Sequence, residues 1–74
     1  MNDKLRKIVA EALDVAESRV DATTGVETEP KWDSLRHMNI IFAIEDGFGV
    51  RFNDDEIPLL TSIGAIEKAL DSRR

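Results

Sequence analysis

Residues 32–50 carry most of the information about the fold, and they read WDSLRHMNIIFAIEDGFGV. Asp33 is a favoured helix N-cap, because its carboxylate can accept hydrogen bonds from the free amides of the first turn. Apolar residues then recur at helical spacing as far as Phe48, where two nearby glycines favour termination. The stretch therefore predicts a helix over residues 34–48.

The predicted helix carries two apolar stripes when its residues are placed on a wheel. The first suits a buried core and comprises Ile40, Ile41, Ile44 and Phe48. The second, called the outer stripe below, comprises Leu35, Met38 and Phe42. Together the stripes are wider than one buried face requires. Since only two other substantial helices can cover them, we expect the outer stripe to be partly accessible; core packing, with Met38 as a gap-filler, is the alternative.

Two further helices are predicted on either side of this stretch. Residues 4–16 place apolar side chains at steps of three and four, opposite a charged face, which is typical of an amphipathic helix. Its apolar face comprises Leu5, Ile8, Val9, Ala12, Leu13 and Ala16. Near the C-terminus, Thr61 or Ser62 is suited to cap a last helix. That helix carries Ile63, Ile66 and Leu70 on one face.

The segment between the first two helices is rich in loop-forming residues. Residues 17–31 contain Gly25 and Pro30 together with Asp21 and three Thr residues, which predicts a loop. We expect Val20 and Val26 to pin this loop to the core. Long ordered loops are often functional.

Before the last helix, residues 54–60 predict a short helical turn that Pro58 limits. No segment has a convincing strand pattern. The predicted fold is therefore all-α: a small bundle of three main helices plus a short fourth helix, with a long loop between the first and second helices. Residues 1–74 are expected to form a single domain.

The composition argues against several kinds of site and partner. The chain has no cysteine and one histidine, so we expect no disulfide, no metal site and no catalytic residue of its own. The formal net charge of -5 disfavours nucleic acid and suits partners with basic surfaces. The N-terminal residues have neither the continuous apolar core of a signal peptide nor the length of a membrane span. A cytoplasmic monomer without membrane insertion is expected.

Ser34 lies at the first helical position, directly after Asp33 and beside the outer stripe. A hydroxyl there projects from a helix N-terminus, where free amides and the helix dipole favour a phosphate. Both residue types are also common as simple helix caps. On spacing alone, the simple cap is the favoured interpretation.

Two neighbours of Ser34 have alternative interpretations. His37 follows by three residues on roughly the same face, but a Ser–His hydrolase pair would also need an orienting group and an oxyanion hole. We therefore expect a surface histidine. Trp32 is expected to pack the loop onto the bundle. An exposed docking anchor is the alternative for Trp32.

The motifs occur in an order that resembles the acyl carrier protein family. They are Trp32-Asp33-Ser34-Leu35, then Met38, Ile40, Ile41 and Ile44, then Glu45-Asp46-Gly47-Phe48-Gly49-Val50. The hallmark of that family is Asp-Ser-Leu at the start of the second helix, followed by an apolar helix body and an acidic end leading into Phe-Gly-Ile/Val. The first helix, the long loop and residues 54–64 follow the family's order too, so the resemblance covers essentially the whole chain. It implies an acyl-carrier-like helical bundle and a single carrier domain over residues 1–74.

The resemblance implies a function for matching positions. Ser34 would accept 4′-phosphopantetheine from coenzyme A through a magnesium-dependent phosphopantetheinyl transferase, and Asp33 would assist the docking of that enzyme. The arm would end in a thiol that holds acyl or aminoacyl groups as thioesters. The chain would then be a free-standing carrier and a substrate for acyl-loading and acyl-transfer enzymes. The residues expected to contact these partners are Leu35, Arg36, Met38, Phe42, Glu45 and Asp46.

One departure from the family pattern concerns charge at the start of the second helix. Carriers of fatty acid synthesis are typically acidic there, whereas this chain has Arg36, His37 and Asn39. Like charge against a basic patch rejects a partner. The hypothesis is a specialised lipid, polysaccharide or secondary-metabolite pathway rather than bulk fatty acid synthesis. An aminoacyl or peptidyl carrier, or an unmodified acidic helical interaction module that presents the outer stripe, remains an alternative.

Overall fold

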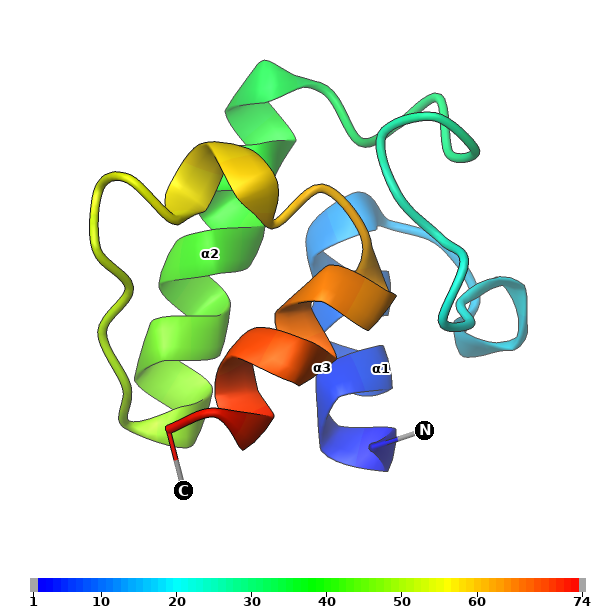
Figure 1. Cartoon of the computed structure of the whole chain (residues 1–74). Helices are drawn as coiled ribbons and strands as arrows, with labels where there is room; N and C mark the ends of the chain where they lie inside the picture. The colour runs from blue at the N-terminus through cyan, green and yellow to red at the C-terminus, as the bar shows by residue number, and fades with distance from the viewer. Residues whose placement is uncertain (1, 74) are drawn as a thin grey trace.

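The computed structural model describes residues 2–73, and within them the fold is all-helical (Figure 1). The elements in chain order are α1 (Asp3–Leu13), η1 (Glu17–Arg19), α2 (Ser34–Phe48), η2 (Ile57–Leu59) and α3 (Ile63–Asp71). The predicted fold class is confirmed: the three main helices are present, and the short fourth element is a single 3-10 turn, η2. In the described part the only β-type pairing is an isolated bridge between Gly25 and Ser62.

All three α-helices contribute to one core. Each helix buries a single face, as expected for amphipathic helices that pack together. The residues with no exposed surface are Leu5, Val9, Leu13, Ile40, Ile41, Ile44, Ile63 and Ile66. Trp32 is 3 % exposed and joins this core. Its predicted packing of the loop onto the bundle is therefore confirmed, and the exposed-anchor alternative is wrong.

The first helix is shorter than predicted. α1 ends at Leu13 because Asp14 adopts a left-handed conformation, with φ 58° and ψ 50°. The Asp14 amide then bonds to the carbonyls of Ala10 and Glu11. Aspartate tolerates this region better than most residues, because its short polar side chain can bond locally. The prediction that the helix continues to Ala16 is wrong, and Ala16 is exposed outside it.

The long loop between α1 and α2 is attached to the start of α3 by its backbone. The Val26 amide donates to the Thr61 carbonyl at 2.9 Å, and the Ile63 amide donates to the Thr24 carbonyl at 2.9 Å. Val20 is 2 % exposed, so its predicted packing in the core is confirmed. Val26 is 43 % exposed, and the corresponding prediction for its side chain is wrong because backbone bonds make the attachment.

A second loop, residues 49–56, is fastened by Arg73 after the end of α3. The Arg73 guanidinium forms an ion pair with Glu56 and lies 4.7 Å from the centre of the Phe52 ring. Hydrogen bonding to Arg73 lowers the pKa of the Glu56 carboxyl. These contacts hold the segment that leads into η2. No helix within residues 2–73 combines the length and the apolar character needed to cross a membrane.

The close approach at Gly25 yields the first prediction. A Cβ atom at this position would lie 2.3 Å from the Thr61 carbonyl oxygen and 2.9 Å from the Ser62 Cα, and backbone atoms cannot move aside cheaply. Gly25→Ala should lower the free energy of unfolding by about 1–3 kcal/mol in urea denaturation. Ala22→Gly, in the same loop without added volume, is the control. An equal loss in both variants would contradict the steric explanation.

Candidate functional site

Ser34 is the first residue of α2, and its hydroxyl is not used to cap the helix. Asp33 is the N-cap in an extended conformation, and its Oδ1 accepts a hydrogen bond from the Arg36 amide at 2.8 Å. Ser34 is exposed, and its hydroxyl has no hydrogen-bond partner among residues 2–73. The simple-cap interpretation of Ser34 is therefore wrong, because Asp33 supplies the cap. The arrangement leaves an available hydroxyl at the N-terminus of a helix of 15 residues.

His37 is not a surface histidine, and the prediction that it is one is wrong. Its ring is half-buried, and Nδ1 lies 3.0 Å from the Trp32 Nε1 while Nε2 lies 2.8 Å from the Ile57 carbonyl oxygen. An indole N–H can only donate and a carbonyl can only accept. Both contacts are satisfied together by a neutral ring with its proton on Nε2. Neither nitrogen is then available as a base for Ser34, so the geometry gives a Ser–His hydrolase pair no support.

A groove of about 600 Å³ opens beside Ser34. It lies between the end of the first loop, the first turns of α2, and η2 with the residues that follow it. Its apolar lining consists of Val26, Trp32, Met38, Ile57 and Pro58. Ser34, Asp33, His37 and Thr61 supply the polar part of the lining. A group attached to the Ser34 hydroxyl can therefore reach an apolar surface directly.

The outer stripe is partly accessible, as predicted. Leu35 is 73 % exposed and Phe42 is 57 % exposed, whereas Met38 is half-buried in the wall of the groove. Asp46 is exposed as well. Glu45 is half-buried, because its Oε2 accepts a hydrogen bond from the Phe52 amide at 2.9 Å and so holds the second loop.

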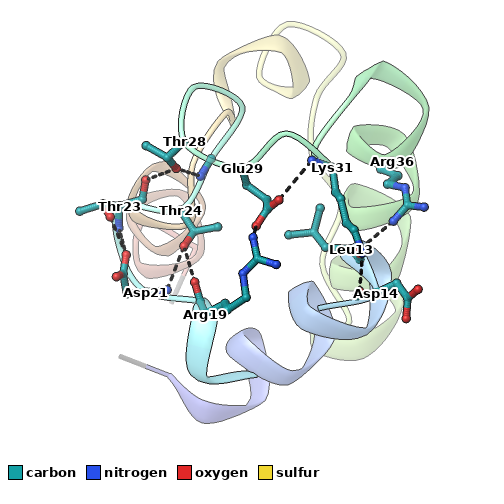
Figure 2. Close-up of polar contacts among 11 residues, drawn as sticks. Leu13, Asp14, Arg19, Asp21, Thr23, Thr24, Thr28, Glu29, Lys31 and Arg36 are labelled. Carbon is teal, nitrogen blue, oxygen red and sulfur yellow. Dashed lines mark hydrogen bonds and ion pairs between the residues drawn. The ribbon is translucent and has the colours of Figure 1, made fainter. Parts of the chain in front are cut away.

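Two cations from the site bind the carbonyl end of α1, and Figure 2 shows both. Arg36 Nη1 donates to the Leu13 carbonyl at 2.7 Å, and Lys31 Nζ donates to the Asp14 carbonyl at 2.9 Å. The last carbonyls of a helix lack partners within it and carry partial negative charge, so cations stabilise them. Arg36 and Lys31 therefore fix the start of α2 and the residues before it against α1.

The buried carboxylate of Glu29 holds together the part of the first loop that precedes Lys31. Glu29 is 5 % exposed, and it accepts hydrogen bonds from Arg19 Nη2 at 2.8 Å and from the Lys31 amide at 3.2 Å (Figure 2). Neither this ion pair nor the bonds that cap the end of α1 can be predicted from the sequence. Their partners are 10 or more residues apart, and no periodic pattern in the sequence links them. Among the described residues, no three His, Asp or Glu side chains come together in a way that could hold a metal ion.

The loop has a further local network around Asp21. Its Oδ1 accepts hydrogen bonds from the Thr23 hydroxyl at 2.6 Å and from the Thr23 amide at 2.8 Å (Figure 2). These bonds favour the ionised carboxylate and lower the pKa of Asp21. The hydroxyl oxygen of Thr24, a buried residue, accepts a hydrogen bond from the Asp21 amide at 3.0 Å.

A pH-dependent effect on stability follows from this shift. The folded-state pKa of Asp21 lies below its unfolded value, so its contribution to stability is present above the unfolded pKa and is lost as the pH falls through the folded pKa. Thr23→Val removes the hydroxyl donor and should raise the pKa of Asp21 in an NMR titration of its carboxyl carbon. Thr61→Val, the same change at another exposed threonine, is the control; an Asp21 pKa unchanged by Thr23→Val would contradict the assignment.

The role of Arg36 at the end of α1 yields another prediction. Arg36→Met removes the donor to the Leu13 carbonyl and leaves no cation from this position at the negative end of the α1 dipole. We expect the free energy of unfolding to fall by about 1–2 kcal/mol. Arg51→Met makes the same charge change at an exposed position and should cost less than about 0.5 kcal/mol. Equal losses in urea denaturation would mean that net charge, not the capping bond, is responsible.

Comparison with known protein families agrees with this geometry. A family profile described as a phosphopantetheine attachment site matches residues 3–70. The matched range begins with α1 and includes the loop, α2, η2 and nearly all of α3. The cofactor of this family is covalently attached 4′-phosphopantetheine, and its members are carriers rather than catalysts. The chain therefore belongs to the phosphopantetheine attachment-site family, that of the acyl carrier proteins.

Proposed function

We propose that this protein carries acyl or aminoacyl groups as thioesters on a 4′-phosphopantetheine arm attached to the hydroxyl of Ser34. The observation that carries the proposal is the exposed, unbonded hydroxyl of Ser34 at the first position of α2, beside an apolar groove. Membership of a phosphopantetheine-binding family supplies the cofactor class. Residues 1–74 would then form one carrier domain.

The residues around Ser34 fit a phosphodiester. Asp33 binds the Arg36 amide through its side chain at 2.8 Å and the His37 amide through its carbonyl at 2.8 Å. Within the described residues, this leaves the amides of Ser34 and Leu35 facing the end of the helix. Free amides and the positive end of the helix dipole favour a negatively charged phosphate at that place.

Attachment would replace the O–H bond of the Ser34 hydroxyl with an O–P bond. The Ser34 oxygen would bond to the phosphorus next to the pantetheine part of coenzyme A, the hydroxyl proton would leave, and adenosine 3′,5′-bisphosphate would be released. A magnesium-dependent phosphopantetheinyl transferase would catalyse this step, with Asp33 assisting its docking. When bound, the cofactor supplies the thiol that this cysteine-free chain lacks.

Partner enzymes would perform the chemistry on the cargo. Acyl-loading and acyl-transfer enzymes would contact the exposed Leu35, Phe42 and Asp46, with Arg36, Met38 and Glu45 at less exposed positions nearby. Because the first turn of α2 carries Arg36 and no acidic residue, we favour a specialised lipid, polysaccharide or secondary-metabolite pathway over bulk fatty acid synthesis. The carrier would act as a cytoplasmic monomer.

A second candidate function rests on the outer stripe alone. Leu35 and Phe42 are exposed apolar residues on an acidic domain, and such residues mark interaction sites when they gather on one face. An unmodified helical interaction module would use this face without any group on Ser34.

Intact-mass spectrometry separates the two functions. The protein is incubated with coenzyme A, magnesium and a broad-specificity phosphopantetheinyl transferase. We expect wild type to gain the mass of one phosphopantetheine and Ser34→Ala to gain none, while Ser18→Ala, an exposed serine outside α2, behaves as wild type. A gain in Ser34→Ala would place the attachment elsewhere. No gain in folded wild type with two different transferases would favour the interaction module.

A further inference from the structure

His37 joins the two sides of the groove beside Ser34. It lies on α2 three residues after Ser34, and residues at this spacing share a helix face. One ring nitrogen binds Trp32 at the end of the first loop, and the other binds the carbonyl of Ile57 in η2. A single side chain therefore holds the loop and η2 against the first turns of α2.

The groove does not extend to the isoleucines of the core. Its apolar lining includes the half-buried Met38 and Ile57 and one face of the core residue Trp32, but its lining does not include the residues Ile41, Ile44 and Ile63. A group tethered to Ser34 reaches this lining without moving any element. To pass between α2 and η2 into the core, the same group would have to break the bond between His37 and the Ile57 carbonyl.

We propose that His37 is a positioning residue that latches η2 to α2 and confines the cargo of the arm to the surface groove. This inference rests on the proposed carrier function and on Ser34 as its attachment site. It also assigns a cargo class. A long saturated chain gains most from complete removal from water, which an open groove does not provide. Short or functionalised acyl groups suit a partly apolar groove with the polar groups of Asp33 and Thr61 in its lining.

The latch has a spectroscopic signature that does not depend on any cargo. The two contacts of His37 require the neutral ring with its proton on Nε2, because Trp32 donates to Nδ1. Nitrogen NMR of the imidazole should therefore show Nε2 protonated and Nδ1 as an acceptor at neutral pH. The opposite tautomer would overturn the latch.

The location of the cargo can be measured directly with an octanoyl group as the probe. The transferase loads octanoyl-phosphopantetheine from octanoyl-coenzyme A, and intact mass verifies the loading, so a failure of the carrier function is detected at that stage. In wild type with labelled isoleucine methyl groups, we expect nuclear Overhauser contacts from the octanoyl chain to Ile57 and none to Ile41, Ile44 or Ile63. Contacts to those core isoleucines, or no contact to Ile57, would overturn the proposal.

Substitutions at His37 test whether the latch is the cause. The amide nitrogen of Gln can reach the Ile57 carbonyl, whereas Asn is suited only to the contact with Trp32, and Phe keeps a ring but neither bond. We expect octanoyl contacts to the core isoleucines in His37→Asn and His37→Phe, and the wild-type pattern in His37→Gln. Asn39→Phe, at an exposed position on the same helix, is the control. If His37→Phe fails to fold, the comparison of octanoyl contacts in His37→Asn and His37→Gln tests the latch instead. The wild-type contact pattern in His37→Asn would overturn the proposal.

Discussion

The hydrogen bond from the Arg36 amide to the Asp33 carboxylate sets the start of α2, and the rest of the site depends on it. It makes Ser34 the first helical residue while leaving the serine hydroxyl unused. Burial of Ile40 and Ile44 in the core sets the rotation of α2 about its axis. With the start and the rotation both fixed, the helical period places Leu35 in solvent and His37 and Met38 in the lining of the groove.

Polar contacts, together with the buried Trp32 ring, position this helix start against the rest of the molecule. A domain of 74 residues has a small core, and the first loop contributes few side chains to it. Glu29, Lys31 and Arg36 instead connect the loop, the carbonyl end of α1 and the first turn of α2. Each contact satisfies a group that would otherwise lack a partner, either a buried carboxylate or a terminal helix carbonyl. The segment that bears Ser34 is thus held both by the first loop and by the carbonyl end of α1.

The features that depend on local spacing are the ones predictable from sequence. The start, the end and the core face of α2 follow from the Asp33 cap, the terminal glycines and the helical period, and the all-α fold follows from three such patterns. The early end of α1 does not, because apolar spacing continues past Asp14 while its left-handed conformation ends the helix. The backbone attachment of Val26 and the half-buried position of His37 depend on partners far along the chain, Thr61 and Ile57, which no periodicity indicates.

The same distinction applies to the candidate site. Ser34 is a candidate because of the order of the surrounding motifs, which is local, whereas its position after Asp33 alone favours a simple cap. The groove depends on tertiary structure and not on local sequence, since its walls come from the first loop, α2 and η2. Those walls meet where the loop and η2 contact the beginning of α2, so the interactions that order them also determine the surface next to Ser34. In this chain, the contacts that connect the loop to η2 through His37 therefore shape the surface beside Ser34.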